Sequence, residues 1–223
     1  MNNLTQRILV GVIAGHVLLY LVYEGKLFFL SFSAIIGALC LWEMYTMFEK
    51  KNFFILKRTS IFFSFLIMAM AYFYLDKLIY LLLLFYILII SFEVFRRDKR
   101  NPKNSFISVF GIVYITIPLV LLNLLINDYI FNVVLYSIVL IWTTDTFAYF
   151  GGKAIGKTPL SDISPKKTVE GAVIGLIMCV VVALIYRAVF IPEISFLDAI
   201  ITGVGIGFFG QVGDLFESIL KRY

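Results

Sequence analysis

The chain has 223 residues, of which 61% are hydrophobic and 15% are charged, and its formal net charge is +5. Soluble domains have roughly 25% charged residues. A water-soluble fold of this length could not bury so much apolar surface, so the composition excludes a soluble globular protein. The basic excess does not indicate a nucleic-acid partner, because the Lys and Arg residues lie in short segments between long apolar blocks. Such segments are typical of integral membrane proteins.

The apolar residues fall into blocks that predict an all-α, polytopic transmembrane helical bundle of about eight spans. The blocks cover 8–23, 27–42, 59–75, 78–95, 106–126, 130–150, 170–191 and 197–213. A helix needs about 20 residues to cross a bilayer, so the shorter blocks leave open whether every helix crosses fully. No small-residue cleavage site follows the first block, which therefore predicts a retained span rather than a signal peptide. Pro118 is expected to kink the fifth span.

The positions of the basic residues predict the orientation of the bundle. Sixteen of the 19 Lys and Arg residues lie in alternate connecting segments or near the two ends of the chain. Only Lys26, Lys77 and Arg187 fall on the other side, and Arg187 can snorkel from a helix end. Because cytoplasmic loops carry the excess of Lys and Arg, both termini are expected in the cytoplasm, which requires an even number of spans.

Asp145 lies in the first of three segments that break the apolar pattern, within the sixth block. A carboxylate at membrane depth is costly unless it meets a cation, a metal ion or water. The alternative is a buried, hydrogen-bonded aspartate near a helix end. We favour a functional role for Asp145.

The second polar segment is the loop at 151–170, which contains the string Ile-Ser-Pro-Lys-Lys-Thr-Val-Glu-Gly. Ser164 is a predicted N-cap and Pro165 a predicted first helical residue. Lys166 and Lys167 then fall in the first helical turn, where the helix dipole disfavours cations unless an anion binds beside them. The pattern therefore predicts a phosphate site, and the alternative is an ordinary cytoplasmic loop.

The third polar segment is the tail at 210–222. At about 100° per residue, Asp214, Glu217, Ser218 and Lys221 share one stripe of a helix. The oxygens of the first three side chains suit a hard cation such as Mg²⁺. The alternative is an amphipathic helix end with an i,i+4 ion pair between Glu217 and Lys221.

The three polar segments together are suited to metal-assisted phosphoryl or nucleotidyl transfer, in which positioning and charge neutralisation do most of the work. They combine acids near the inner membrane boundary with a pair of lysines in the adjoining loop. A soluble phosphate donor would arrive from the cytosol and a lipid acceptor from the membrane.

Three strings in this region carry a resemblance to a known family. They are Asp145-Thr-Phe-Ala-Tyr-Phe-Gly-Gly-Lys153-Ala-Ile-Gly-Lys157, Ile163-Ser-Pro-Lys-Lys-Thr-Val-Glu-Gly171 and Gly213-Asp-Leu-Phe-Glu-Ser218-Ile-Leu-Lys221-Arg222. Residues from about 140 to 223 closely resemble the phosphatidate cytidylyltransferase (CDP-diacylglycerol synthase) family. The earlier spans resemble it only in hydropathy and layout.

The resemblance implies condensation of CTP with phosphatidate to give CDP-diacylglycerol and pyrophosphate. It implies a multi-pass protein of the bacterial cytoplasmic membrane whose active site faces the cytosol, with helices at 1–105 preceding a catalytic region at 106–223. Mg²⁺ is the expected cofactor, a second and monovalent cation is compatible with it, and a homodimer is left open.

The resemblance also assigns site residues. The catalytic candidates are Asp145, Asp214 and Lys167. The metal candidates are Asp214, Asp145 and Glu217. The substrate-binding candidates are Ser164, Lys166, Lys167, Thr168, Ser218, Lys221 and Arg222.

The sequence departs from the family pattern after Arg222. In the family the signature continues into a Lys-Asp pair, a Gly-His-Gly-Gly stretch and an Asp-Arg-x-Asp motif, whereas this sequence ends at Tyr223. Little or no activity is therefore expected of this chain.

Two other functions stay open on sequence grounds. A CTP-dependent lipid-alcohol kinase would release CDP rather than pyrophosphate. A transporter or a non-catalytic scaffold would consume no CTP.

Overall fold

The computed structural model describes residues 15–21, 23–24, 26–128 and 131–222. All the elements named in these residues are helices, which confirms the all-α prediction. The chain forms two compact units, Met1–Tyr129 (unit 1) and Ile130–Tyr223 (unit 2). The helices at residues 102–128 pack against the earlier helices of unit 1, while the predicted division into helices at 1–105 and a catalytic region at 106–223 stays a prediction.

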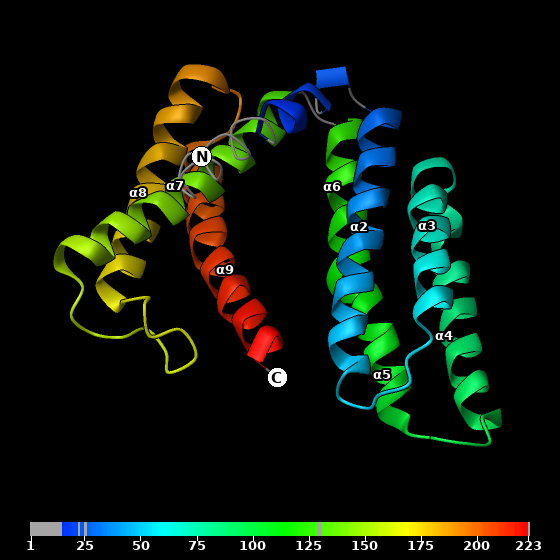
Figure 1. Cartoon of the computed structure of the whole chain (residues 1–223). Coiled ribbons are helices and arrows are strands. Elements are labelled where there is room, and N and C mark those ends of the chain that lie inside the picture. The colour runs from blue at the N-terminus through cyan, green and yellow to red at the C-terminus, as the bar shows by residue number, and fades with distance from the viewer. Residues whose placement is uncertain (1–14, 22, 25, 129–130, 223) are drawn as a thin grey trace, which may run out of the picture. The chain divides into compact units, whose positions relative to one another are not determined.

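Unit 1 is a set of helices that lie side by side (Figure 1). Its α-helices are α2 (Lys26–Glu49), α3 (Lys57–Phe73), α4 (Leu78–Phe95), α5 (Pro102–Gly111) and α6 (Ile117–Asp128). The 3₁₀ helix η1 (Leu75–Lys77) joins α3 to α4, and the π-helical segment η2 (Ile112–Thr116) joins α5 to α6.

Polar side chains join the helices of unit 1 to one another. The Asn123 amide donates to the Ser33 hydroxyl at 2.8 Å, and the Ser64 and Thr116 hydroxyls share a hydrogen bond of 2.9 Å. Where lipid surrounds a bundle, interhelical hydrogen bonds of this kind hold helices together.

The π-helical segment η2 lies immediately before the proline that is expected to bend this span. Pro118 has no N–H to donate, and a local change of helical pitch is one way in which a chain accommodates that loss. Pro118 itself is the second residue of α6. The kink at Pro118 stays a prediction.

Unit 2 consists of α7 (Phe131–Ile155), α8 (Val169–Phe190) and α9 (Phe196–Arg222), and each of the three helices contacts the other two. Glycine allows α7 and α8 to approach closely. A Cβ added at Gly175 would lie 2.8 Å from the Thr144 carbonyl oxygen and 2.9 Å from the Ala148 Cβ. The small-residue spacing of this segment therefore marks a helix–helix contact, a common use of glycine in membrane bundles.

Six helices in the described part of the chain are long and apolar enough to cross a membrane, so the predicted number of about eight is too high. They are Leu27–Glu49, Leu75–Phe95, Pro102–Leu125, Asn132–Ile155, Val169–Phe190 and Phe196–Arg222. Helix α3 has 17 residues, so it is about 26 Å long, slightly less than the roughly 30 Å of bilayer hydrocarbon. Most of the first predicted span, 8–23, lies outside the described residues.

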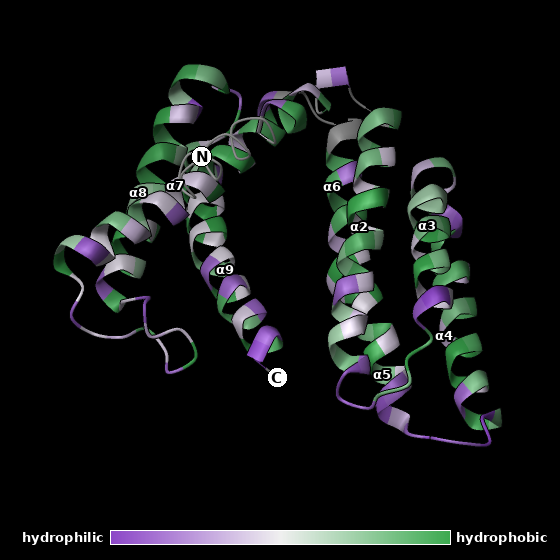
Figure 2. Ribbon diagram, viewed as in Figure 1, coloured by the Kyte–Doolittle hydropathy of each residue, from purple (hydrophilic) through white to green (hydrophobic). Residues whose placement is uncertain are grey.

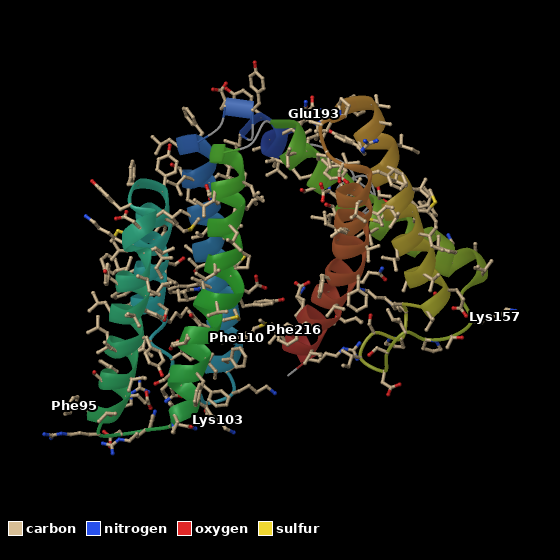
Figure 3. All side chains as sticks on the ribbon, turned by 180° about the vertical axis from the view of Figure 1, so that it is seen from behind. Phe95, Lys103, Phe110, Lys157, Glu193 and Phe216 are labelled. Atoms are coloured by element: carbon tan, nitrogen blue, oxygen red, sulfur yellow. The ribbon has the colours of Figure 1, made fainter. Side chains whose placement is uncertain are left out.

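Each unit gathers its hydrophilic residues toward one end (Figure 2). In unit 1, Phe95 and Lys103 mark the end at which α4 stops and α5 begins (Figure 3). In unit 2, Glu193 lies at the end opposite to Lys157 and the loop between α7 and α8 (Figure 3). This segregation agrees with the distribution of basic loops, while the orientation with both termini in the cytoplasm stays a prediction.

Candidate active site

Residues from all three predicted segments meet in one cleft of unit 2, with a volume of about 590 Å³. Small-molecule sites commonly measure about 300–1,000 Å³. The cleft is lined by Asp145, Ala148, Tyr149, Gly152 and Lys153 of α7, by Leu160, Ser164, Lys166, Lys167 and Thr168 of the following loop, by Ala172 of α8, and by Gln211 and Asp214 of α9.

Helix α7 contributes one face to the cleft. Asp145, Tyr149 and Gly152 follow one another at intervals of about one helical turn, and Lys153 lies one turn after Tyr149. A Cβ added at Gly152 would lie 2.8 Å from the Thr168 hydroxyl oxygen. The absence of a side chain at Gly152 therefore lets the loop before α8 close against α7.

The prediction that a helix starts at Pro165, in the loop before α8, is wrong. Helix α8 begins at Val169, and its N-cap is Thr168, whose hydroxyl accepts a 3.2 Å hydrogen bond from the Gly171 N–H. Lys166 and Lys167 are therefore not in a first helical turn, and Ser164 is not the N-cap.

A tight turn takes the place of the predicted helix start. The Lys167 N–H donates to the Ser164 carbonyl at 3.0 Å, with Pro165 at the second position, where its fixed φ favours a β-turn. The two arms of the loop then pair, since the Leu160 N–H donates to the Lys167 carbonyl at 2.8 Å. The turn places both lysines at the lining of the cleft.

Glu170 ties this loop to the start of α8. Its carboxylate accepts hydrogen bonds from the Lys157 N–H and the Thr158 N–H, both at 3.1 Å, and from the Thr158 hydroxyl at 3.0 Å. Hydrogen bonds to a charged acceptor are stronger than those between neutral groups. Glu170 therefore restrains the segment that carries Lys166 and Lys167, a role that sequence reasoning missed.

Lys167 lies among acidic side chains from two helices. Its ammonium group forms an ion pair with the Asp214 carboxylate, and the two side chains remain 33% and 47% exposed. Burial lowers the pKa of Lys167, whereas the charges of Asp145 and Glu217 raise it. The structure thus brings Asp145, Lys167 and Asp214 into one electrostatic environment.

Gln211 holds α9 against α8 one turn before Asp214. Its amide nitrogen donates to the Ala172 carbonyl at 3.1 Å and to the Gly207 carbonyl at 2.8 Å. The side chain also lines the cleft. Sequence reasoning missed Gln211, although an amide three residues before Asp214 in an apolar helix was a signal for it.

The remaining predicted residues of α9 do not line the cleft. Glu217 forms a 2.6 Å ion pair with Lys221, which is the alternative that the sequence left open. The Ser218 hydroxyl donates to the Asp214 carbonyl at 2.9 Å, and Arg222 is exposed. The substrate-binding roles of Ser218, Lys221 and Arg222 stay predictions.

The cleft is lined by two carboxylates that could meet a metal ion, those of Asp145 and Asp214. Among the described residues no group of three or more His, Cys, Asp and Glu side chains is placed to hold one, and the metal role of Glu217 stays a prediction. Mg²⁺ is commonly bound by one or two carboxylates together with substrate phosphates. Asp145 and Asp214 fit that pattern, and the ammonium group of Lys167 beside them shows that this position attracts a cation.

The chain is similar to several phosphatidate cytidylyltransferases. The phosphatidate cytidylyltransferase of Bacillus subtilis is 32% identical over an alignment that covers 100% of this chain and 86% of that protein. The Staphylococcus saprophyticus protein of the same name is 31% identical over 61% of this chain and 52% of its own length. Phosphatidate cytidylyltransferase 5, chloroplastic, of Arabidopsis thaliana is 48% identical over 91 residues, which are 40% of this chain and 22% of the plant protein.

A family model gives the same result over nearly the whole chain. The model of the cytidylyltransferase family matches residues 5–223. This range includes both units and every residue of the cleft. The chain therefore belongs to the cytidylyltransferase family of nucleotidyltransferases.

Proposed function

We propose that this protein transfers a cytidylyl group from CTP to phosphatidate, forming CDP-diacylglycerol and pyrophosphate. The observation that carries the proposal is the meeting of Asp145, Lys166, Lys167 and Asp214 in one cleft of a cytidylyltransferase-family chain. The substrate pair comes from the relatives, which are phosphatidate cytidylyltransferases.

The charges of the cleft suit a triphosphate that arrives with a divalent cation. In the structure Asp214 and Lys167 neutralise each other. When the nucleotide binds, Lys167 would turn to phosphate oxygens, and Asp214 and Asp145 would be free to hold the cation. Lys166, in the same turn, adds a second positive charge. This exchange of partners keeps charges paired, and phosphoryl-transfer catalysis depends mainly on such positioning and neutralisation.

The chemical step is a displacement at the α-phosphorus of CTP. A phosphate oxygen of phosphatidate forms the new P–O bond, the bond between the α- and β-phosphates breaks, and pyrophosphate leaves with the electron pair. A magnesium ion held by Asp145 and Asp214 would neutralise the charge that develops on the phosphate oxygens. Lys167 and Lys166 hold the triphosphate in line.

The surroundings of the cleft suit one soluble and one lipid substrate. The cleft lies at the end of unit 2 that carries the polar loop, while α7, α8 and α9 are each apolar enough to cross a membrane. CTP enters from the aqueous side and phosphatidate from the adjoining leaflet. Because the basic loops mark the cytoplasmic side, the site faces the cytosol.

Product analysis with CTP labelled in the α-phosphate tests the proposal. Purified protein in lipid nanodiscs is expected to release pyrophosphate and to label a lipid only when phosphatidate is present. Release of labelled CDP, together with a phosphorylated lipid that carries no label, would instead favour the lipid-alcohol kinase. Consumption of no CTP at high protein concentration would favour the transporter or scaffold.

Nucleotide binding gives a second readout that does not depend on turnover, because low activity of this chain stays a prediction. A fluorescent CTP analogue is expected to bind in the presence of Mg²⁺ and to bind about tenfold more weakly to Lys167→Gln, which loses one charge-assisted contact. Lys51→Gln removes a charge from an exposed turn of unit 1 and is the matched control. Equal binding by the wild type and Lys167→Gln would contradict the proposal.

A further inference from the structure

A second cavity lies in unit 1, in the groove between α4 and α5, with a volume of about 450 Å³. One part of its wall is formed by Tyr86, Ile90 and Val94 of α4 and by Ser105, Phe106 and Val109 of α5, and the lining is completed by Arg100, Pro102 and the carboxylate-bearing Glu93. These positions recur at helical intervals, so each helix presents one stripe to the groove. Except at Ser105, this part of the wall is formed by apolar or aromatic side chains.

The dimensions of the groove match one leaflet of a membrane. Tyr86 and Val94 are separated by eight residues of α4, or about 12 Å along the helix axis. Half of the bilayer hydrocarbon is about 15 Å thick. Both helices are parts of segments that can cross a membrane, so lipid chains would surround this groove.

Arg100 closes the groove at its polar end. Its Nε donates to the Arg96 carbonyl at 3.1 Å, which orients the guanidinium group. Within the described residues Arg100 forms no ion pair with a carboxylate. An oriented guanidinium group with free donors is well suited to bind phosphate oxygens.

The charges around Arg100 favour an anion. Five basic and two acidic residues lie between 93 and 103. Of the acids, Glu93 is already satisfied, because it accepts from the Asn101 N–H at 2.7 Å and the Asn104 amide at 3.0 Å and pairs with Arg96 at 3.5 Å. Its charge is therefore largely neutralised within the protein, and the surrounding field is positive.

We infer that the α4–α5 groove is a binding site for an anionic glycerophospholipid, separate from the cleft of unit 2. One acyl chain lies along the wall formed by Ile90, Phe106 and Val109, and the headgroup phosphate binds Arg100. The start of α5, with Asn101 as its N-cap, adds the positive end of a helix dipole at the same position. The inference does not depend on the reaction proposed for unit 2.

Photolabelling of the 223-residue chain in nanodiscs tests this site. The probes are phosphatidylglycerol and phosphatidylcholine that carry a diazirine in one acyl chain, and labelled peptides are mapped by mass spectrometry. The phosphatidylglycerol probe is expected to label residues 86–109 about fivefold more than the phosphatidylcholine probe, which is the effect of one arginine facing an anionic headgroup. Arg100→Gln removes this preference, whereas Lys51→Gln, at an exposed turn outside the groove, keeps it.

A groove-filling variant tests the acyl-chain part of the inference. Ser105→Phe is expected to reduce labelling of residues 86–109 by both probes at least threefold, and Ser105→Leu, a smaller change, serves if the phenylalanine variant does not fold. Equal labelling by the two lipids in the wild type, or an unchanged preference in Arg100→Gln, would overturn the site. Cross-linking of the groove to a second copy of the chain instead of lipid would also overturn it.

Discussion

The two units use their polar side chains in different ways. In unit 1, Glu93 is 7% exposed and accepts hydrogen bonds from Asn101 and Asn104, so its charge serves packing. In unit 2, Asp145 and Asp214 are exposed to a cleft, and the Asp214 carboxylate pairs with Lys167, a side chain that can exchange partners. Both acids of unit 2 lie in helices that are apolar enough to cross a membrane, although the mean hydropathy of these helices, 1.5, is lower than the 1.9 to 2.6 of the spans in unit 1.

This difference shows that an acid in an apolar helix indicates a function only when its partners come from elsewhere in the chain and remain accessible. The partners of Glu93 lie 3 to 11 residues away and enclose it. The partner of Asp214 is Lys167, which belongs to the loop before α8, and its side chain is 33% exposed. Substitutions in the two units should therefore affect different quantities, turnover in unit 2 and stability in unit 1.

Asp214→Asn should have the largest effect on turnover. The amide keeps the size of the side chain but removes the charge that holds the cation, so kcat should fall by about 10³-fold. Initial rates of CDP-diacylglycerol formation measure this loss. Glu193→Gln, the same acid-to-amide change at the opposite end of unit 2, should leave the rate within about twofold. A large loss in this control would contradict the claim that turnover depends on the acids of the cleft.

Lys167→Gln should reduce kcat/KM for CTP by about 10²-fold, since it removes a charge-assisted contact to phosphate and leaves Asp214 unpaired. Lys167→Arg should recover part of this loss, because the charge is kept while the geometry of the donors changes. Steady-state kinetics with CTP varied provides the test. Equal kcat/KM values for the wild type and Lys167→Gln would show that Lys167 does not contribute to binding CTP.

Glu170→Gln should lower kcat/KM for CTP by about tenfold. The Glu170 carboxylate accepts hydrogen bonds from the backbone of Lys157 and Thr158 and thereby restrains the loop that carries Lys166 and Lys167. Glu170 itself does not line the cleft. Hydrogen exchange of residues 156–168 should rise in the variant. A loss of activity with unchanged exchange would show that Glu170 acts by another route.

Glu217→Gln should change kcat by less than about fivefold, because Glu217 pairs with Lys221 outside the cleft and exposed pairs contribute little energy. This result would show that kcat depends less on the Glu217 carboxylate than on the carboxylates of Asp145 and Asp214, which line the cleft. A loss as large as that of Asp214→Asn would restore the three-carboxylate set that the sequence predicted.

Glu93→Gln should affect stability rather than chemistry. It leaves the largely buried Arg96 without its ion partner and should lower the free energy of unfolding by about 2 kcal/mol. Thermal unfolding of the purified protein measures the change. The protein that remains folded should keep its kcat, and a specific loss of kcat would contradict the division of roles between the units.

The sequence predicted the helices well because long apolar blocks leave the backbone few alternatives in lipid. It predicted the wrong start for α8 because proline suits both the first residue of a helix and the second position of a β-turn. The pairing of Leu160 with Lys167 selects the turn, and no local pattern contains that information.

The meeting of Asp145, Lys167 and Asp214 was predicted from Asp145 within an apolar block, Lys167 in the adjoining polar loop and Asp214 just after the last block, together with the family resemblance. Gln211 and Glu170 were missed because their partners are polar groups up to 39 residues away. The choice between a metal role and an ion pair for Glu217 also could not be made from spacing, since an i,i+4 pair and a metal-binding stripe use the same face of a helix.

The central claim is that Asp145 and Asp214 bind one divalent cation together with the phosphates of CTP. Electron paramagnetic resonance of Mn²⁺ titrated into the CTP complex measures that site directly. Phosphorus hyperfine coupling from bound CTP is expected in the wild type, and Mn²⁺ affinity is expected to be at least about tenfold lower in both Asp145→Asn and Asp214→Asn. Unchanged Mn²⁺ affinity in the two variants, with the phosphorus coupling intact, would contradict it.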